Sequence, residues 1–99
     1  EIVKQSQAFR SPFAHKNVVI AGDLDVDEYE LANAVKNLGG LIRDEVGQDT
    51  DYLLVGDHDF FRTDIVELNK ARALKKQGQN IRIWSEQFFL NVLDNWARS

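Results

Sequence analysis

The chain has 99 residues, 43% of them hydrophobic, which is enough for one folded domain with a modest core and excludes an intrinsically disordered chain. No apolar run approaches the ~18 residues of a transmembrane helix, so we expect no membrane partner. Cysteine is absent, which excludes disulfides and thiolate metal sites and fits an intracellular protein.

The net charge of −4 is unevenly distributed along the chain. Residues 23–67 contain thirteen acidic and three basic residues, whereas residues 68–99 contain six basic and two acidic residues. A surface that binds DNA through its phosphates must be contiguous and basic. The residues that could form such a strip are Lys70, Arg72, Lys75, Lys76 and Arg82. A solvated helix face explains them more simply than a DNA-binding surface does.

The first half of the chain predicts a helix between short strands. A strand is predicted at residues 18–20, and Asp27 then starts a helix, because a glutamate follows three residues later in a variant of the capping box. Apolar residues at the i, i+3, i+4 and i+7 positions from Leu31 give this helix one buried face, and Gly39–Gly40 ends it. A short extended run at residues 41–42 follows the glycines.

The second half predicts two strands and two helices. The continuous apolar run at residues 52–55 suits a strand that is covered on both faces. After a loop that contains two adjacent phenylalanines, Thr63 is expected to cap a helix over residues 64–77. Residues 81–84 alternate as a last strand, and Ser85 is expected to cap a final helix that is apolar on more than one side.

The predicted order is β-α-β-β-α-β-α. A loop without a helix joins the second and third strands, so we place these strands on opposite sides of the first. The sequence therefore predicts an α/β fold in three layers, with a four-stranded parallel sheet in the order 2-1-3-4 and three flanking helices. Residues 1–12 are expected to be a polar lead-in or linker, and residues 13–99 a single domain.

Alternating carboxylates follow the first strand at Asp23, Asp25 and Asp27. The spacing is that of a calcium loop, but Glu28 and Ala34 stand where such a loop needs a glycine and a bidentate glutamate. A D-x-D motif after a hydrophobic strand also resembles the haloacid-dehalogenase phosphatases, with Asp23 as nucleophile. That chemistry would need Asp57 and Asp59 to hold magnesium and Lys36 to balance the charge. The chain looks too short for the phosphatase fold. A hydrated acidic loop with a helix cap is the simpler interpretation.

The whole pattern resembles a BRCT domain, the small α/β module of DNA repair and replication proteins. The resemblance covers nearly the full chain, from Phe13 to Leu93. It rests on the segments Phe13–Gly22, Leu38–Gly40, Thr50–Gly56, Lys70–Ala71, Ile83–Glu86 and Phe88–Leu90 in this order and spacing. In detail the chain is most similar to BRCT domains of bacterial NAD-dependent DNA ligases, exonuclease-type proteins and the replication factor C large subunit.

This resemblance implies binding rather than catalysis, and many members of the family grip a phosphate. They use a hydroxyl and a glycine amide after the first strand, a lysine at the start of the second helix and, in some DNA-binding members, an arginine early in the first helix. The corresponding residues here are Ala21, Gly22, Glu67 and Glu28. Ala21 thus has a methyl group in place of the family's hydroxyl, and Glu67 and Glu28 are acidic where the family has basic residues. Acidic side chains repel a phosphate. We therefore expect the usual phosphate pocket to be absent.

The resemblance thus implies a non-catalytic interaction module of a DNA repair or replication protein in the cytoplasm, nucleoid or nucleus, with no catalytic residue, cofactor or metal. Its partner is expected to be a protein, bound through a surface other than the phosphate pocket. The aromatic residues proposed for that surface are Phe60, Phe61, Phe88 and Trp96. Because the last helix is apolar on more than one side, it could also pack against a partner domain or a second copy of the chain.

One alternative remains, in which the chain binds DNA ends or a phosphopeptide in a phosphate-dependent manner. Residues 57–64 look longer than in ligase-type members, which would shift the second helix and relocate its basic residues. The residues that would contact the anion are Gly22, Arg62, Thr63 and Lys70.

Overall fold

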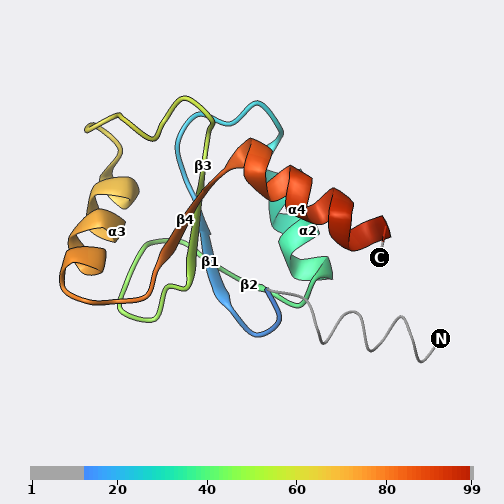
Figure 1. Cartoon of the computed structure of the whole chain (residues 1–99), viewed down its shortest axis with the longest axis horizontal. Helices are drawn as coiled ribbons and strands as arrows, with labels where there is room; N and C mark the ends of the chain where they lie inside the picture. The colour runs from blue at the N-terminus through green and yellow to red at the C-terminus, as the bar shows by residue number, and fades with distance from the viewer. Residues whose placement is uncertain (1–12, 99) are drawn as a thin grey trace.

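A computed structural model describes residues 13–98, with side chains as far as Asn95 (Figure 1). The expected lead-in, residues 1–12, lies outside the described residues. The described elements are β1 (Asn17–Ile20), α2 (Glu28–Asn37), β2 (Leu41–Arg43), β3 (Tyr52–Val55), α3 (Val66–Lys76), β4 (Arg82–Ser85) and α4 (Glu86–Arg98). Within this part of the chain, no helix has the length and apolarity to cross a membrane.

The four strands form one parallel sheet in the order β2-β1-β3-β4. Val19 of β1 lies opposite Arg43 of β2 and Leu53 of β3, and Leu53 in turn lies opposite Ile83 of β4. The inner strands are therefore β1 and β3. Figure 1 shows α3 on one face of the sheet and α2 and α4 on the other. The predicted three-layer fold, its strand order and its three helices are confirmed.

The face toward α2 and α4 holds an aromatic core around Phe13. The ring of Phe13 is fully buried and lies 4.8 Å from that of Tyr52, 5.4 Å from Trp84 and 5.3 Å from Phe89, measured between ring centroids. Aliphatic side chains of β1, β3 and α2 complete this cluster: Val18, Leu31, Val35, Leu38 and Leu54. Phe13 thus fixes the first described residue of the chain to both β4 and α4.

The opposite face is covered by α3 and by residues 44–51, the loop that joins β2 to β3. Val46 of this loop is buried in the same cluster as Leu68 and Ala71 of α3. Two side chains near the ends of α3 hold the loop: Oε2 of Glu67 accepts the N–H of Val46 at 2.5 Å, and Nε2 of Gln79 donates to the carbonyl of Gly47 at 3.0 Å. One helix and one loop therefore cover this face.

The helix boundaries follow the predicted caps except at α3. Oδ1 of Asp27 accepts the N–H of Tyr29 at 2.9 Å, and Oγ of Ser85 accepts that of Phe88 at 3.1 Å. The prediction that Thr63 caps a helix from residue 64 is wrong, because α3 begins at Val66 after Ile65, which makes no side-chain cap. Instead, the carbonyl of Thr63 accepts a hydrogen bond from Nδ2 of Asn69 at 2.7 Å, which keeps this residue in the preceding loop.

Candidate functional site

The loops that follow β1 and β3 meet at the carboxyl edge of the sheet, because the two strands are parallel neighbours. The carboxylate of Asp59 lies between these loops, and the residue is only 1% exposed. Its Oδ2 accepts the backbone N–H of Asp23 at 2.9 Å and that of Gly56 at 2.8 Å. One buried carboxylate therefore binds a backbone donor from each of the two loops.

Gly22 makes room for this carboxylate. Its φ is +83°, in the left-handed region that favours glycine, and a Cβ built on it would lie 2.2 Å from Oδ2 of Asp59. A side chain at position 22 would thus both strain the backbone and displace Asp59. The residue that the sequence placed in an anion-binding loop lies directly beside an anion of the chain itself.

Arg62 closes the site from the solvent side, where three carboxylates surround it. Its Nη1 lies 2.5 Å from Oδ2 of Asp23 and 3.1 Å from Oδ1 of Asp59, and its Nη2 lies 2.8 Å from Oδ2 of Asp64. Hydrogen bonds to Asp64, Asp23 and Asp59 raise the pKa of Arg62, and the bond from Arg62 lowers the pKa of Asp64. Gly22 and Arg62 are therefore brought together, with Asp59 between them.

The other two residues proposed for an anion site have contacts elsewhere. Nζ of Lys70 lies 3.5 Å from Oε2 of Glu45 and 3.6 Å from Oε1 of Glu67. Thr63 contributes its backbone carbonyl to Asn69. Glu67, which stands where the family resemblance implies a lysine, accepts the N–H of Val46 and so belongs to the anchor of residues 44–51.

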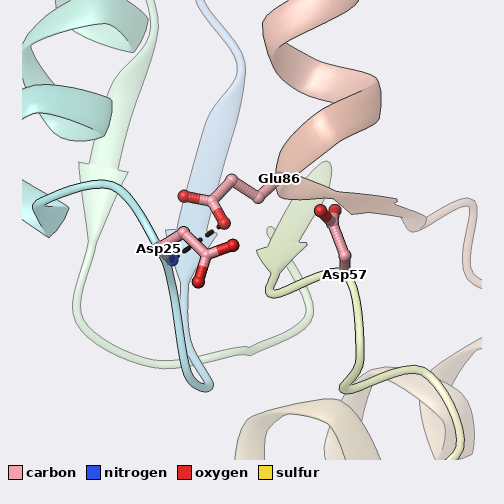
Figure 2. Close-up of side chains that lie close together, drawn as sticks. All are labelled: Asp25, Asp57 and Glu86. Atoms are coloured by element: carbon pink, nitrogen blue, oxygen red, sulfur yellow. Dashed lines mark hydrogen bonds between the residues drawn. The ribbon is translucent and has the colours of Figure 1, made fainter.

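A second set of carboxylates lies where β1, β3 and β4 end (Figure 2). Oxygen atoms of Asp25, Asp57 and Glu86 lie within 4.8 Å of one another. Glu86 is buried, and its two oxygens accept the N–H groups of Asp25 at 2.9 Å and Val26 at 2.6 Å. Oδ1 of Asp57 accepts the N–H of Gln87 at 2.8 Å, at the start of α4. Backbone donors thus account for the position of two of these three carboxylates.

Sequence reasoning missed the structural roles of Asp59 and Glu86. It treated Asp57 and Asp59 as possible magnesium ligands of a phosphatase, but in the structure they accept backbone N–H groups at different places. Asp23, the nucleophile of that alternative, contacts Arg62 through its carboxylate. Asp59 accepts the N–H of the residue three positions before it, Gly56, a local contact that the sequence did not indicate.

Aromatic side chains surround a hollow of about 300 Å³ beside the last strand, and the residues lining it are Phe60, Ile83, Trp84, Ser85 and Phe88. The rings of Trp84 and Phe88 meet edge to face at 4.8 Å, while Phe88 remains 49% exposed. Phe61, which follows the lining residue Phe60 in the sequence, is 95% exposed. The structure therefore brings Phe60 and Phe88 together; the side chain of Trp96 lies outside the described part of the chain.

Fold and site together define a small parallel α/β module whose carboxyl-edge loops are tied down by its own carboxylates. The BRCA1 C Terminus (BRCT) domain family matches residues 8–93, and the chain belongs to this family. BRCT domains are generally non-catalytic modules that commonly mediate protein or DNA interactions.

Among curated proteins the chain is similar to bacterial DNA ligases. It is 36% identical over 58 residues to the DNA ligase of Helicobacter acinonychis (strain Sheeba). It is 34% and 33% identical, also over 58 residues, to the DNA ligases of Helicobacter pylori strains P12 and Shi470. Each alignment covers 59% of this chain and 9% of the ligase, so the matched part is a small fraction of those proteins.

Proposed function

We infer that this chain is a non-catalytic BRCT module of a DNA repair or replication protein, working in the cytoplasm or nucleoid and binding a protein partner without a phosphate pocket. Residues 1–12 are its linker and residues 13–99 the module. The observation that supports the lack of a phosphate pocket is the buried carboxylate of Asp59, which accepts N–H groups from the loops after β1 and β3. Family membership and the similarity to bacterial DNA ligases support the DNA-related setting.

A phosphate arriving at this edge would meet a buried carboxylate that already binds the N–H groups of Asp23 and Gly56. A phosphate carries nearly two negative charges, and here it would meet the carboxylates of Asp23 and Asp59. The nearby cation, Arg62, already contacts both of them and Asp64. Because buried hydrogen bonds to a charged group are costly to leave unmade, the internal carboxylate holds the donors against an external anion.

The aromatic surface beside β4 is the proposed contact for the protein partner. Phe60 and Phe88 line its hollow, and Phe61 stands 95% exposed in the same loop as Phe60. Aromatic side chains concentrate binding energy at interfaces because they bury much area with few rotatable bonds. The residues to substitute first in a test of partner binding are therefore Phe60, Phe61 and Phe88.

Phosphate binding is tested by NMR titration of the labelled chain with a phosphoserine peptide and a 5′-phosphorylated recessed duplex, each beside its unphosphorylated counterpart. We expect no phosphate-dependent shift at the amides of Gly22, Asp23 and Gly56. A phosphate-dependent shift there, or around Arg62 and Lys70, overturns the inference and establishes the phosphate-dependent alternative.

Partner binding is tested by placing a photo-crosslinking phenylalanine analogue at position 88. The matched control carries it at position 29, because Tyr29 is 82% exposed on α2, away from the hollow. We expect crosslinking from position 88 to give discrete protein adducts that the control does not give. These adducts should disappear when the chain also carries Phe60→Ala. Equal adduct patterns from both positions would contradict a partner surface at β4.

A further inference from the structure

The strand β4 is an open edge of the sheet. Within the described residues it pairs with β3 alone. The N–H of Arg82 donates to the carbonyl of Asp51, at the start of β3. Because backbone groups alternate in direction along a strand, the N–H and C=O groups of Ile83 and the N–H of Ser85 point away from β3, toward the free side. The C=O of Ser85 belongs to the cap of α4. This edge can therefore accept another strand.

Apolar side chains stand on both faces of this same edge. Phe60 and Ile83 pack with the cluster on the α3 face, whereas Trp84 packs with the cluster on the α2 and α4 face and touches Phe88. All four line the hollow of about 300 Å³. Successive side chains of an added strand point to opposite faces, so two adjacent residues would enter this hollow from the two sides.

The residues at the amino ends of β1, β3 and β4 leave a net positive charge, because they include two cations and one carboxylate. Arg82 and Lys16 are exposed and line a second, polar hollow of about 150 Å³. Among the described residues, neither forms an ion pair with a carboxylate; Oδ2 of Asp51, in the same hollow, accepts the N–H of Asn17. A partner with a carboxylate at this end of the edge would therefore complete the charge pattern.

We propose that the β4 edge binds an extended peptide segment of a partner protein by strand addition. The segment carries a carboxylate facing Arg82 and, within a few residues, two adjacent apolar side chains for the Phe60–Ile83 and Trp84–Phe88 sides of the hollow. The proposal rests on the proposed function, since it specifies the chemistry of the protein partner. The register follows from the rise of a strand, which places the lining residues Ile83 to Ser85 about 3–10 Å from Arg82 along β4.

A second copy is the competing occupant of this edge. Two copies paired through β4 about a two-fold axis would set Arg82 of one strand against the carboxyl end of the other, where Asp57 and Glu86 lie. Both of these carboxylates already accept backbone N–H groups, so a peptide carboxylate without such bonds is the better partner for Arg82. An acidic–apolar peptide satisfies both ends of the edge.

The test uses a displayed library of random peptides, selected against the full chain. We expect the selected peptides to share a carboxylate near two adjacent apolar residues. Synthetic peptides of that sequence should bind about tenfold more weakly to the Phe88→Ala variant, and severalfold more weakly to Arg82→Gln. The matched controls are Tyr29→Ala and Lys76→Gln, which alter an exposed ring and an exposed cation elsewhere.

Backbone measurements distinguish strand addition from other contacts. We expect the bound peptide to slow hydrogen exchange at the amides of Ile83 and Ser85, and N-methylation of alternate peptide residues to abolish binding with a period of two. Peptides that bind the hollow without either effect overturn strand addition but leave the proposed function standing. Failure to enrich any peptide, or dimerisation of the chain through β4, also overturns it, whereas a requirement for phosphate on the peptide overturns the proposed function itself.

Discussion

The Cα of Gly22 faces the carboxylate of Asp59 so closely that a Cβ at position 22 would lie 2.2 Å from Oδ2. The two residues come from the loops after β1 and β3, so their contact joins the inner strands at the carboxyl edge. We predict that Gly22→Ala destabilises the fold by about 2–4 kcal/mol, since it adds left-handed strain to the loss of buried hydrogen bonds. Urea denaturation measures the change.

The control for this prediction is Gly78→Ala. Gly78 also has a positive φ, +101°, but a Cβ there would meet nothing within 4 Å. It should therefore show only the strain, about 1–2 kcal/mol. In an Asp59→Ala background the additional cost of Gly22→Ala should fall to a similar value, because the clashing carboxylate is gone. Equal costs of Gly22→Ala in both backgrounds would contradict the contact.

Truncation of Phe89 should open a cavity in the aromatic core. Phe89 is fully buried, and its ring lies 5.3 Å from that of Phe13. We expect Phe89→Ala to cost about 3–5 kcal/mol of unfolding free energy, while Phe61→Ala, which removes a ring that is 95% exposed, should change it by less than about 0.5 kcal/mol. Thermal and urea denaturation of the two variants would give similar midpoints if Phe89 did not support the core.

Glu86 should contribute to stability through the backbone of the β1–α2 loop. Its two oxygens accept the N–H groups of Asp25 and Val26, and the residue is 2% exposed. Glu86→Gln replaces one acceptor by a donor, so we expect a loss of about 1–3 kcal/mol and faster hydrogen exchange at both amides. The same substitution at Glu45, which has an exposed partner in Lys70, should cost no more than about 0.5 kcal/mol.

The pairing of Arg62 with Asp64 predicts a loss of stability in acid. The hydrogen bond from Arg62 lowers the pKa of Asp64 below its ordinary value of 3.8. Because the folded form keeps this carboxylate charged at a pH where the unfolded chain protonates it, the stabilisation is complete above about pH 4 and declines as the pH falls through the folded pKa. Urea midpoints of Asp64→Asn should therefore depend less on pH below 4 than those of the wild type.

Asp44→Asn is the control for the acid prediction, because Asp44 is exposed and makes no ion pair among the described residues. Its urea midpoints should follow those of the wild type throughout. If Asp64→Asn also followed the wild type below pH 4, the Arg62–Asp64 pair would not contribute to folding in solution.

The sequence was sufficient for the fold because its signals were local. The apolar stripe from Leu31, the glycines at 39–40 and the continuous run at 52–55 each determine one element, and the loop without a helix determines the strand order. The start of α3 could not be predicted in this way. Thr63 has the right side chain for a cap, but its carbonyl is held by Asn69, a contact that depends on tertiary geometry.

The candidate site was harder to predict, because its residues are set by contacts between distant loops. Arg62 looked like a free cation in the sequence, yet it contacts Asp23, thirty-nine positions away, as well as Asp59 and Asp64. Likewise, the acidic run after β1 gave no indication that its backbone N–H groups bind Asp59 and Glu86. The sequence shows how many charged residues there are but not which of them are in contact.

The attachment of residues 44–51 to both ends of α3 has a consequence for local unfolding. Glu67 and Gln79 hold the loop at Val46 and Gly47, and Val46 shares a buried cluster with Leu68 and Ala71. Neither the loop nor the helix can leave the sheet without exposing the apolar surface of the other. The two segments should therefore open as one cooperative unit, with amides of the loop exchanging at the rate of the helix despite having no regular structure of their own.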